Sequence, residues 1–256
     1  MKRLLIAVAI NEEFKTVAKL LKAREDHSDK NYKRARGTIN GYPVEVLMTS
    51  MGMEASKRAA ADNIIPGEHG GVLVLGYCGG LSLTLKVGDT VVASHVIDDQ
   101  NKNKVALDSV LCELLGKAHC KEGLKYKCVP MITQRRVIET PEEKATLLGL
   151  TKAEAVDMES VEIVEAALKN KVKVAVVKVV VDDSETEMPN LNDYFDRKGK
   201  IDHRNIAPVF VAQPGLTFQL SQFMKKANGI LSQSIPPMID VLCPYWEISK
   251  VPLKTK

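Results

Sequence analysis

The chain has 256 residues and a formal net charge of +4, with 45% hydrophobic and 27% charged residues. This length fits one large α/β domain with a substantial core, and the composition is ordinary for a soluble protein. The positive charge is spread along the chain, which argues against nucleic acid as a partner, and no apolar run reaches the length of a membrane span.

The first apolar segment, Leu4–Ile10, predicts a buried strand. It is too short for a signal peptide, because Asn11, Glu12 and Glu13 follow at once. A helix is expected to begin there. Either Asn11 caps that helix, with the two acids favourably placed in its first turn, or one of the acids faces the edge of the sheet where ligands bind.

The middle of the chain contains clear turn and strand signals. Residues 37–48 predict a hairpin around Asn40-Gly41. The strand that starts at Gly71 is expected to run into a glycine-rich turn at residues 76–81, where backbone amides could approach a ligand. Neither a Walker nor a Rossmann phosphate motif is present. Thr140 before Pro141 predicts a helix start, and a strand is expected at 131–138.

Two acids stand out in the segment from 155 to 183. Glu159 precedes a helical pattern, and Asp182 follows the β-branched, apolar run 172–181, which is typical of a strand buried on both faces. Carboxylates at strand ends lie where α/β sheets bind ligands. Burial should raise the pKa of Asp182, so that it could donate a proton near neutral pH. The alternative is that Asp182 or Asp183 only caps the following turn.

The C-terminal quarter is more polar and irregular. Residues 184–203 predict a loop or lid, and residues 209–231 predict a helix interrupted near Pro214-Gly215. Pro236-Pro237 and the segment from Cys243 predict an extended tail. We therefore expect a single domain over residues 1–242 and a C-terminal tail over residues 243–256.

The five cysteines do not indicate a metal centre, and no cofactor is expected. Their number is odd, and none has zinc-site spacing to another cysteine or to a histidine. The simplest interpretation is a reducing, cytoplasmic setting. The cysteines are Cys78, Cys112, Cys120, Cys128 and Cys243.

Several motifs together resemble one family. Val156–Ser160 followed by Asp182, and the glycine-rich segment followed by Lys86–Asp89, resemble the purine nucleoside phosphorylase and nucleosidase superfamily, closest to its methylthioadenosine/S-adenosylhomocysteine nucleosidase branch. The resemblance implies a three-layer α/β fold with a mixed, partly barrel-like central sheet flanked by helices. Residues 196–199 and 213–216 also resemble a hopanoid-associated (adenosylhopane) subfamily that acts on an adenosyl-linked lipid precursor.

The resemblance implies hydrolysis of the N-glycosidic bond of an adenosine-type nucleoside with a modified 5′ group. Asp182 would protonate the base at N7, Glu159 would bind the ribose hydroxyls, and Glu13 would activate water, with Glu12 as the neighbouring alternative. The residues that would contact the substrate are Met158, Met51, Gly79, Tyr77, Cys78, Val137, Ile138 and Ile10.

Departures from the family pattern bear on the nucleophile and the base. Phosphorylases of the family hold phosphate with an Arg and a Ser or Thr where this chain has Val74 and Tyr77. This favours water, because an apolar side chain cannot offset the desolvation of an oxyanion. Val181 and Lys178 replace a Ser and an Arg near the catalytic acid. Val137 stands where family members place an aromatic residue against the base.

Two alternatives remain open at this stage. One is a phosphorylase whose phosphate is held by Lys178 or Lys57. The other is a non-catalytic nucleoside-binding protein of the same fold. In either case the partner is a small-molecule nucleoside. Because family members commonly form dimers or larger assemblies, a homo-oligomer is also expected.

Overall fold

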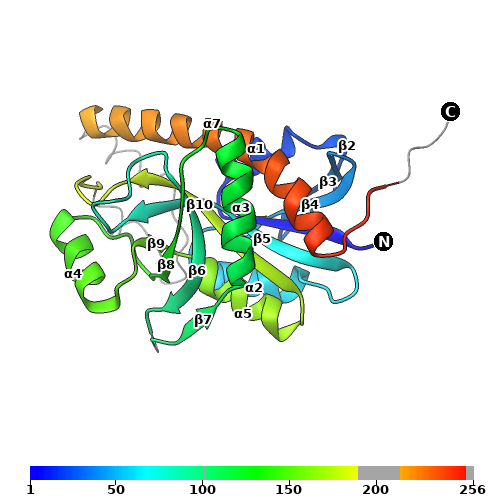
Figure 1. Cartoon of the computed structure of the whole chain (residues 1–256), viewed down its shortest axis with the longest axis horizontal. Coiled ribbons are helices and arrows are strands. Elements are labelled where there is room, and N and C mark those ends of the chain that lie inside the picture. Colours follow the sequence, from blue (N-terminus) through cyan, green and yellow to red (C-terminus); the bar gives the residue numbers. More distant parts are fainter. Residues whose placement is uncertain (101, 190–213, 252–256) are drawn as a thin grey trace.

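A computed structural model describes residues 1–100, 102–189 and 214–251 of the chain. It contains a ten-stranded sheet and flanking helices (Figure 1). The strands are β1 (Arg3–Val8), β2 (Lys22–Asp26), β3 (Lys33–Ile39), β4 (Tyr42–Met48), β5 (His69–Gly80), β6 (Thr90–Asp98), β7 (Lys104–Ala106), β8 (Tyr126–Thr133), β9 (Ala155–Asp157) and β10 (Lys173–Asp182). The helices are α1 (Asn11–Ala18), α2 (Met53–Asn63), α3 (Ser109–Lys121), α4 (Pro141–Thr151), α5 (Ser160–Lys169) and α7 (Pro214–Tyr245).

The sheet closes on itself through five of its strands. β5 pairs with β10, β10 with β6, β6 with β8, β8 with β9, and β9 returns to β5. Some pairings are parallel and others antiparallel, as between β5 and β9. β1, β4, β3 and β2 continue the sheet outward from β5. The predicted mixed, partly barrel-like sheet is therefore confirmed.

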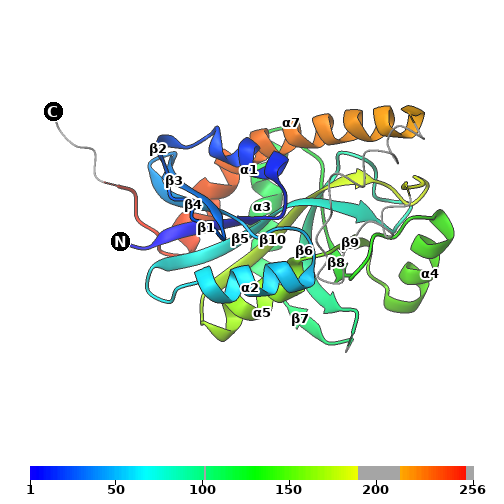
Figure 2. The ribbon, with the colours of Figure 1, turned by 180° about the vertical axis from the view of Figure 1, so that it is seen from behind.

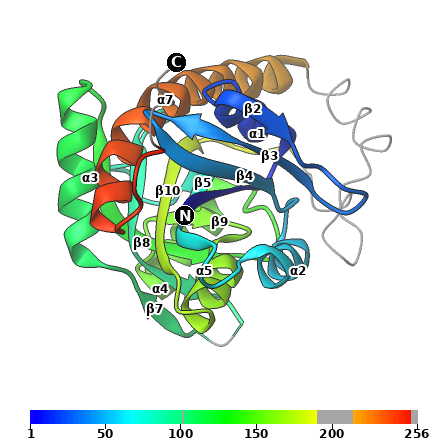
Figure 3. The ribbon, with the colours of Figure 1, turned by 90° about the vertical axis from the view of Figure 1, so that its right-hand side faces the viewer.

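Helices cover both faces of the sheet, which gives three layers. α1, α3 and α7 pack on one face, and α2 and α5 pack on the other (Figures 2 and 3). Each face has its own apolar core, because the strands between them are apolar on both sides. α4 lies at one end of the molecule, beyond the ends of β8 and β9 (Figure 1).

The glycine-rich segment is not the turn that the sequence predicts. β5 continues through Gly76 to Gly80, because β10 pairs with it on one side and β9 on the other. A Cβ atom at Gly79 would lie 3.0 Å from Asp182 Oδ2. The glycines thus let a paired strand pass close to an acidic side chain.

The first of the two expectations for this segment is wrong, because Asn11 does not cap the helix. The N-cap residue is Ile10, which offers no side-chain hydrogen bond, and Asn11 is already helical. Instead, Glu13 Oε2 accepts hydrogen bonds from the N–H groups of Ala9 and Ile10, just before the helix, at 2.8 and 3.0 Å. The predicted N-cap at Thr140 is confirmed, with its hydroxyl accepting from the Glu143 N–H at 3.2 Å.

The predicted extended tail is wrong at its start. α7 begins at Pro214, runs through Pro236 and Pro237, and ends at Tyr245. It changes direction along its length, as expected where prolines remove helical hydrogen bonds (Figure 1). Trp246 and Ile248 are buried in the core beyond the helix. Apolar burial therefore holds this segment against the domain.

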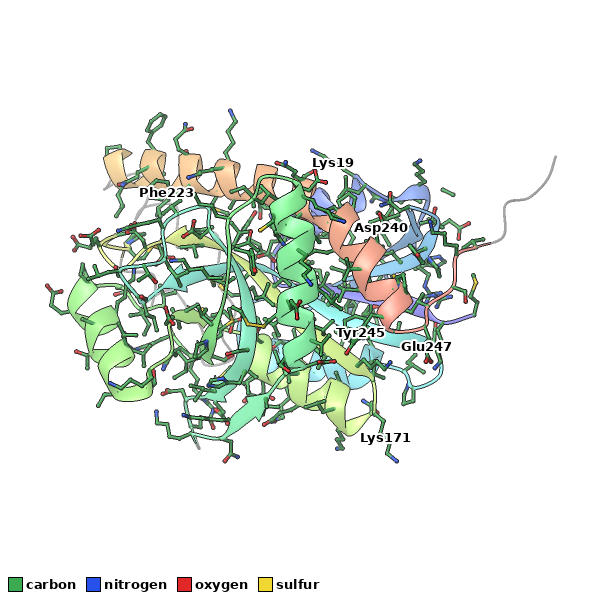
Figure 4. All side chains as sticks on the ribbon, in the orientation of Figure 1. Lys19, Lys171, Phe223, Asp240, Tyr245 and Glu247 are labelled. Carbon is green, nitrogen blue, oxygen red and sulfur yellow. A yellow bond between two sulfur atoms is a disulfide. The ribbon has the colours of Figure 1, made fainter. Side chains whose placement is uncertain are left out.

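α7 also contacts α3 through hydrogen bonding and packing. Tyr245, at the end of α7, donates its hydroxyl to Asp108 Oδ2 at 2.7 Å (Figure 4). Asp108 is the N-cap of α3. The C-terminal helix thus stabilises the start of another helix on the same face of the sheet.

A disulfide joins α3 to β8 through Cys112 and Cys128. The sequence led us to expect a reducing setting, and the spacing of these cysteines gives no sign of the pairing, which depends on α3 packing against β8. The free cysteines are Cys78, Cys120 and Cys243.

No helix in the described part of the chain is both long and apolar enough to cross a membrane. The predicted loop or lid at 184–203 is described only as far as residue 189, and residues 196–199 lie outside the described residues.

Candidate active site

A cavity of about 220 Å³ opens at the carboxyl ends of β1, β5, β9 and β10. Every catalytic and substrate-contact residue predicted from the sequence lines it. Those residues are Ile10, Glu13, Met51, Tyr77, Cys78, Gly79, Val137, Ile138, Met158, Glu159 and Asp182. The fold therefore brings together residues from segments that are far apart in the chain.

Glu13 is fixed by backbone amides from β5 and from the two residues that follow β1. Its Oε2 binds the amides of Ala9 and Ile10, and its Oε1 accepts the N–H of Tyr77 at 2.9 Å. Burial raises the pKa of Glu13, against the opposing effects of Lys178 and these amides. Glu12 is exposed and does not line the cavity, so it is not a competing candidate.

Glu159 lies between the start of α2 and a buried lysine. Its Oε1 accepts the N–H of Gly52, the N-cap of α2, at 2.9 Å, and its Oε2 lies 3.9 Å from Lys178 Nζ. Burial raises the pKa of Glu159 to about 7; Lys178 opposes the shift and Asp157 adds to it. The group therefore changes charge close to neutral pH.

Lys178 and Asp157 form a buried ion pair beside the cavity. Lys178 Nζ lies 3.0 Å from Asp157 Oδ2. Burial alone would lower the pKa of Lys178, but the carboxylates of Asp157, Glu159 and Glu13 outweigh it and raise that pKa. Lys178 therefore remains a cation, and its positive charge compensates the negative charge of three acids.

Asp157 also organises the start of α5. Its carboxylate accepts hydrogen bonds from the Thr133 hydroxyl at 2.8 Å and from the N–H and hydroxyl of Ser160. The Thr133 hydroxyl in turn accepts the N–H of Val161 at 3.1 Å. Asp157 was not predicted from the sequence to have a role, although it directly precedes Met158 and Glu159, which were.

Asp182 ends β10 and is bonded to a lysine that the sequence analysis missed. Lys144 Nζ, from α4, donates to Asp182 Oδ2 at 2.6 Å. Burial raises the pKa of Asp182, and Lys144 acts against that shift. The turn-capping role belongs to Asp183, whose Oδ1 accepts the Thr186 hydroxyl at 2.8 Å and the Glu185 N–H at 3.2 Å.

The rest of the cavity wall is mostly apolar. Besides the predicted contacts, it includes Val181, Met188 from the segment after β10, and Met224 from α7. Tyr77 donates its hydroxyl to Asn228 of α7, which also accepts the Thr16 hydroxyl at 2.8 Å. The Cys78 thiol is buried, which raises its pKa and keeps it from acting as a thiolate.

The two lysines considered as phosphate ligands already form ion pairs with carboxylates. Lys178 is buried among carboxylates, and Lys57 is 61% exposed and paired with Glu162 at 3.3 Å. Arg136 lines the cavity, but its guanidinium donates to Glu143 at 2.7 Å. None of the three side chains is an unpaired cation, which would be needed to offset the desolvation of a bound phosphate.

Glu45, Glu68 and His69 form a cluster with metal-ligand chemistry away from the cavity. Two arginines already neutralise it: Arg36 Nε lies 2.9 Å from Glu45, and Arg3 pairs with Glu68. A divalent cation would have to displace these guanidinium groups. We interpret the cluster as an ion-pair network that holds β1, β3 and β4 together.

Comparison with known proteins places these features in a family. The family model described as "Phosphorylase superfamily" matches residues 3–210. None of the curated protein sequences matches the chain significantly.

Solved structures show the same fold at low sequence identity. A futalosine hydrolase mutant of Helicobacter pylori is 16% identical and aligns over 94% of this chain and 100% of its own, with a TM-score of 0.75. The 5′-methylthioadenosine/S-adenosylhomocysteine nucleosidase of Neisseria meningitidis, bound to methylthio-immucillin-A, is 17% identical over 94% of this chain and 100% of its own, with a TM-score of 0.74. The Helicobacter pylori nucleosidase of the same type is 17% identical over 94% and 99%, with a TM-score of 0.74.

Proposed function

The chain belongs to the phosphorylase superfamily, and on that premise we propose that it is a nucleosidase that hydrolyses the N-glycosidic bond of a purine nucleoside with a modified 5′ group. The observation that carries the proposal is the meeting of Glu13, Glu159 and Asp182 in one cavity. Each is buried, and each is held by named hydrogen-bond donors.

The reaction needs a leaving base that becomes neutral. Asp182 lines the cavity, and Lys144 is the donor that binds its Oδ2 among the residues that the structure describes. Its Oδ1 therefore remains for the base. A protonated Asp182 would give its proton to N7 as the C–N bond breaks, so that the base leaves without negative charge.

The ribose develops positive charge as the base departs. Glu159 would accept hydrogen bonds from ribose hydroxyls and stabilise that charge when ionised. Met158 precedes it in the chain and lines the same cavity, where it would pack on the sugar. Since the pKa of Glu159 is about 7, its ionised form becomes dominant only above neutral pH.

Glu13 would activate the attacking water. A carboxylate offers about four lone-pair sites, and backbone amides use three of those on Glu13. One site on Oε1 remains to accept a hydrogen bond from water and then its proton. The Tyr77 amide, which would otherwise be free to bind an anion, is already occupied by this carboxylate.

Water is therefore a better nucleophile than phosphate at this site. Among the described residues that line the cavity, none supplies an unpaired cation that would offset the repulsion between a phosphate and the carboxylates of Glu13 and Glu159. The apolar wall formed by Ile10, Met51, Met188 and Met224 favours an apolar 5′ substituent.

The test is release of free adenine from adenosines that carry methylthio, homocysteinyl, long alkyl or no substituent at the 5′ position, with and without phosphate. We expect release without phosphate from the apolar members, and its loss in Asp182→Asn with the fold intact. Release that requires phosphate would identify a phosphorylase. Binding without turnover would identify a nucleoside-binding protein.

The long-alkyl substrate also tests whether an adenosyl-linked lipid is accepted, as the resemblance to the hopanoid-associated subfamily suggests. The homo-oligomer and the single domain over residues 1–242 stay predictions. Sedimentation equilibrium tests the first of these, and limited proteolysis tests the second.

A further inference from the structure

Lys144 is a fully buried lysine in the first half of α4. Lysine is almost never fully buried unless it is paired. All three donors of its ammonium group are used, by Asp182 Oδ2 at 2.6 Å, Asp183 O at 2.7 Å and Thr186 O at 2.8 Å. Lys144 therefore links α4 to the end of β10 and to the turn after it, with every ammonium donor in use.

The start of α4 is built so that Lys144 has a fixed position. Thr140 and Glu143 form a capping box, with Pro141 between them at the first helical position. Glu143 also accepts the N–H of Glu139 at 2.9 Å. The Met188 N–H, from the segment after β10, donates to Glu139 O at 2.8 Å. The two segments that Lys144 joins are thus held together on both sides of it.

We propose that Lys144 is a positioning residue for the proposed nucleosidase reaction: its ammonium fixes one carboxyl oxygen of Asp182 and the turn that follows, so that the other carboxyl oxygen faces the base. The effect of Lys144 on catalysis rests on the proposed function, whereas its contact with Asp182 rests on hydrogen-bond geometry alone. The sequence does not indicate this role, because a lysine that follows two glutamates at the start of a helix resembles a solvated surface residue.

The charge of Lys144 has a second consequence for Asp182. The groups that face this carboxyl are Lys144 from α4, the neighbouring Asp183, and the buried thiol of Cys78 on β5. Among them only Lys144 favours the ionised carboxylate. Without it, burial and Asp183 would both hold the proton on Asp182, which would then be a weaker acid toward the base.

The first experiment does not depend on turnover. Aspartate carboxyl groups labelled with ¹³C are titrated by NMR in the wild type, Lys144→Met and Lys144→Arg, and the Asp182 signal is assigned by its loss in Asp182→Asn. We expect the pKa of Asp182 to rise by about one unit or more in Lys144→Met and to stay close to the wild-type value in Lys144→Arg. An unchanged pKa in folded Lys144→Met overturns the proposal, whether or not any nucleoside is cleaved.

The second experiment uses the nucleoside that the wild type cleaves. We expect Lys144→Met to lower kcat by about 10- to 100-fold, with KM changed less than about threefold, and its pH–rate profile to extend to higher pH. Lys144→Arg should recover part of the loss. A raised pKa with unchanged kcat overturns the positioning role.

Two controls separate this result from other failures. Lys117→Met removes an exposed helical lysine, 66% exposed, and should change neither pKa nor kcat. If Lys144→Met does not fold, Lys144→Gln keeps two amide donors for the two carbonyls and removes the charge together with the third donor, so that the same titration tests the effect of the charge on Asp182. A wild type that cleaves no nucleoside refutes the proposed function while the NMR titration still tests the Lys144–Asp182 contact.

Discussion

Lys178 Nζ lies 3.0 Å from Asp157 Oδ2, with each side chain about 1% exposed. The same ammonium lies 3.9 Å from Glu159 Oε2, and its charge also acts on Glu13. One buried cation therefore compensates three acids next to the cavity. Removing a single partner from such a group leaves uncompensated buried charge, which is far more costly than the net contribution of the pair.

Lys178→Met should lower the free energy of unfolding by about 3–5 kcal/mol. Urea denaturation at neutral pH measures it. The matched control is Lys57→Met, because Lys57 is 61% exposed and its ion pair with Glu162 should contribute less than about 1 kcal/mol. Equal effects of the two substitutions would contradict a structural role for the buried cation.

Glu159→Gln should change how stability depends on pH. The folded pKa of Glu159 is about 7 and its ordinary value is 4.5. Between these values the folded state holds a proton that the unfolded state has lost, so the wild type loses stability as pH rises through this window. The variant lacks this loss, which is on the order of 3 kcal/mol in total.

Urea unfolding of both proteins at pH 5 and pH 8 measures that difference. Glu54→Gln serves as the control, since Glu54 is exposed on α2 and should leave the pH dependence as in the wild type. Parallel pH curves for the wild type and Glu159→Gln would show that Glu159 titrates normally.

Gly76→Ala should displace Glu13. A Cβ atom at this position would lie 2.4 Å from Glu13 Oε1, in a strand that is paired on both sides. We expect base release to fall by about 100-fold, since small displacements of a catalytic group have effects of this size. Stability should fall by about 1–3 kcal/mol through overpacking.

The control for this substitution is Gly149→Ala in α4, where no atom lies within 4 Å of the added Cβ. It should raise stability by about 0.5–1 kcal/mol and leave base release unchanged. If Gly76→Ala retains full activity, Glu13 does not need its observed position.

Reduction of the Cys112–Cys128 disulfide should destabilise the protein. The two cysteines are 16 residues apart. Closing a loop of that length reduces the entropy of the unfolded chain, which stabilises the folded state by about 3 kcal/mol. A reductant should therefore lower the urea midpoint of the wild type but not that of Cys112→Ser. Cys120→Ser, which removes an exposed free thiol from the same helix, should respond to the reductant as the wild type does.

Local sequence signals were sufficient for much of the fold. The apolar run up to Val181 predicts β10, and Thr140 with Pro141 predicts the start of α4, because burial and capping depend on neighbouring residues. Many of the cavity-lining residues could be predicted, because their motifs occur in the same order as in a known family.

Features that depend on distant contacts could not be predicted in this way. Lys144 is buried because α4 packs near the end of β10, 38 residues away in the chain. The glycines after Leu75 favour a turn locally, but two paired strands keep them extended. Pro236 and Pro237 favour an extended tail, yet apolar packing of residues such as Met238 keeps them helical.

The closed ring of β5, β10, β6, β8 and β9 limits how a substrate can reach the acids. A ring of strands has no free edge in its circuit, so its members cannot part without losing hydrogen bonds on both sides. Substrate and product therefore cannot pass between these strands, and the way to the acids is bordered by irregular segments that contain Met51, Val137 and Met188. Rates of substrate binding and product release should therefore be set by these segments, while the strands keep the acids in register throughout the catalytic cycle.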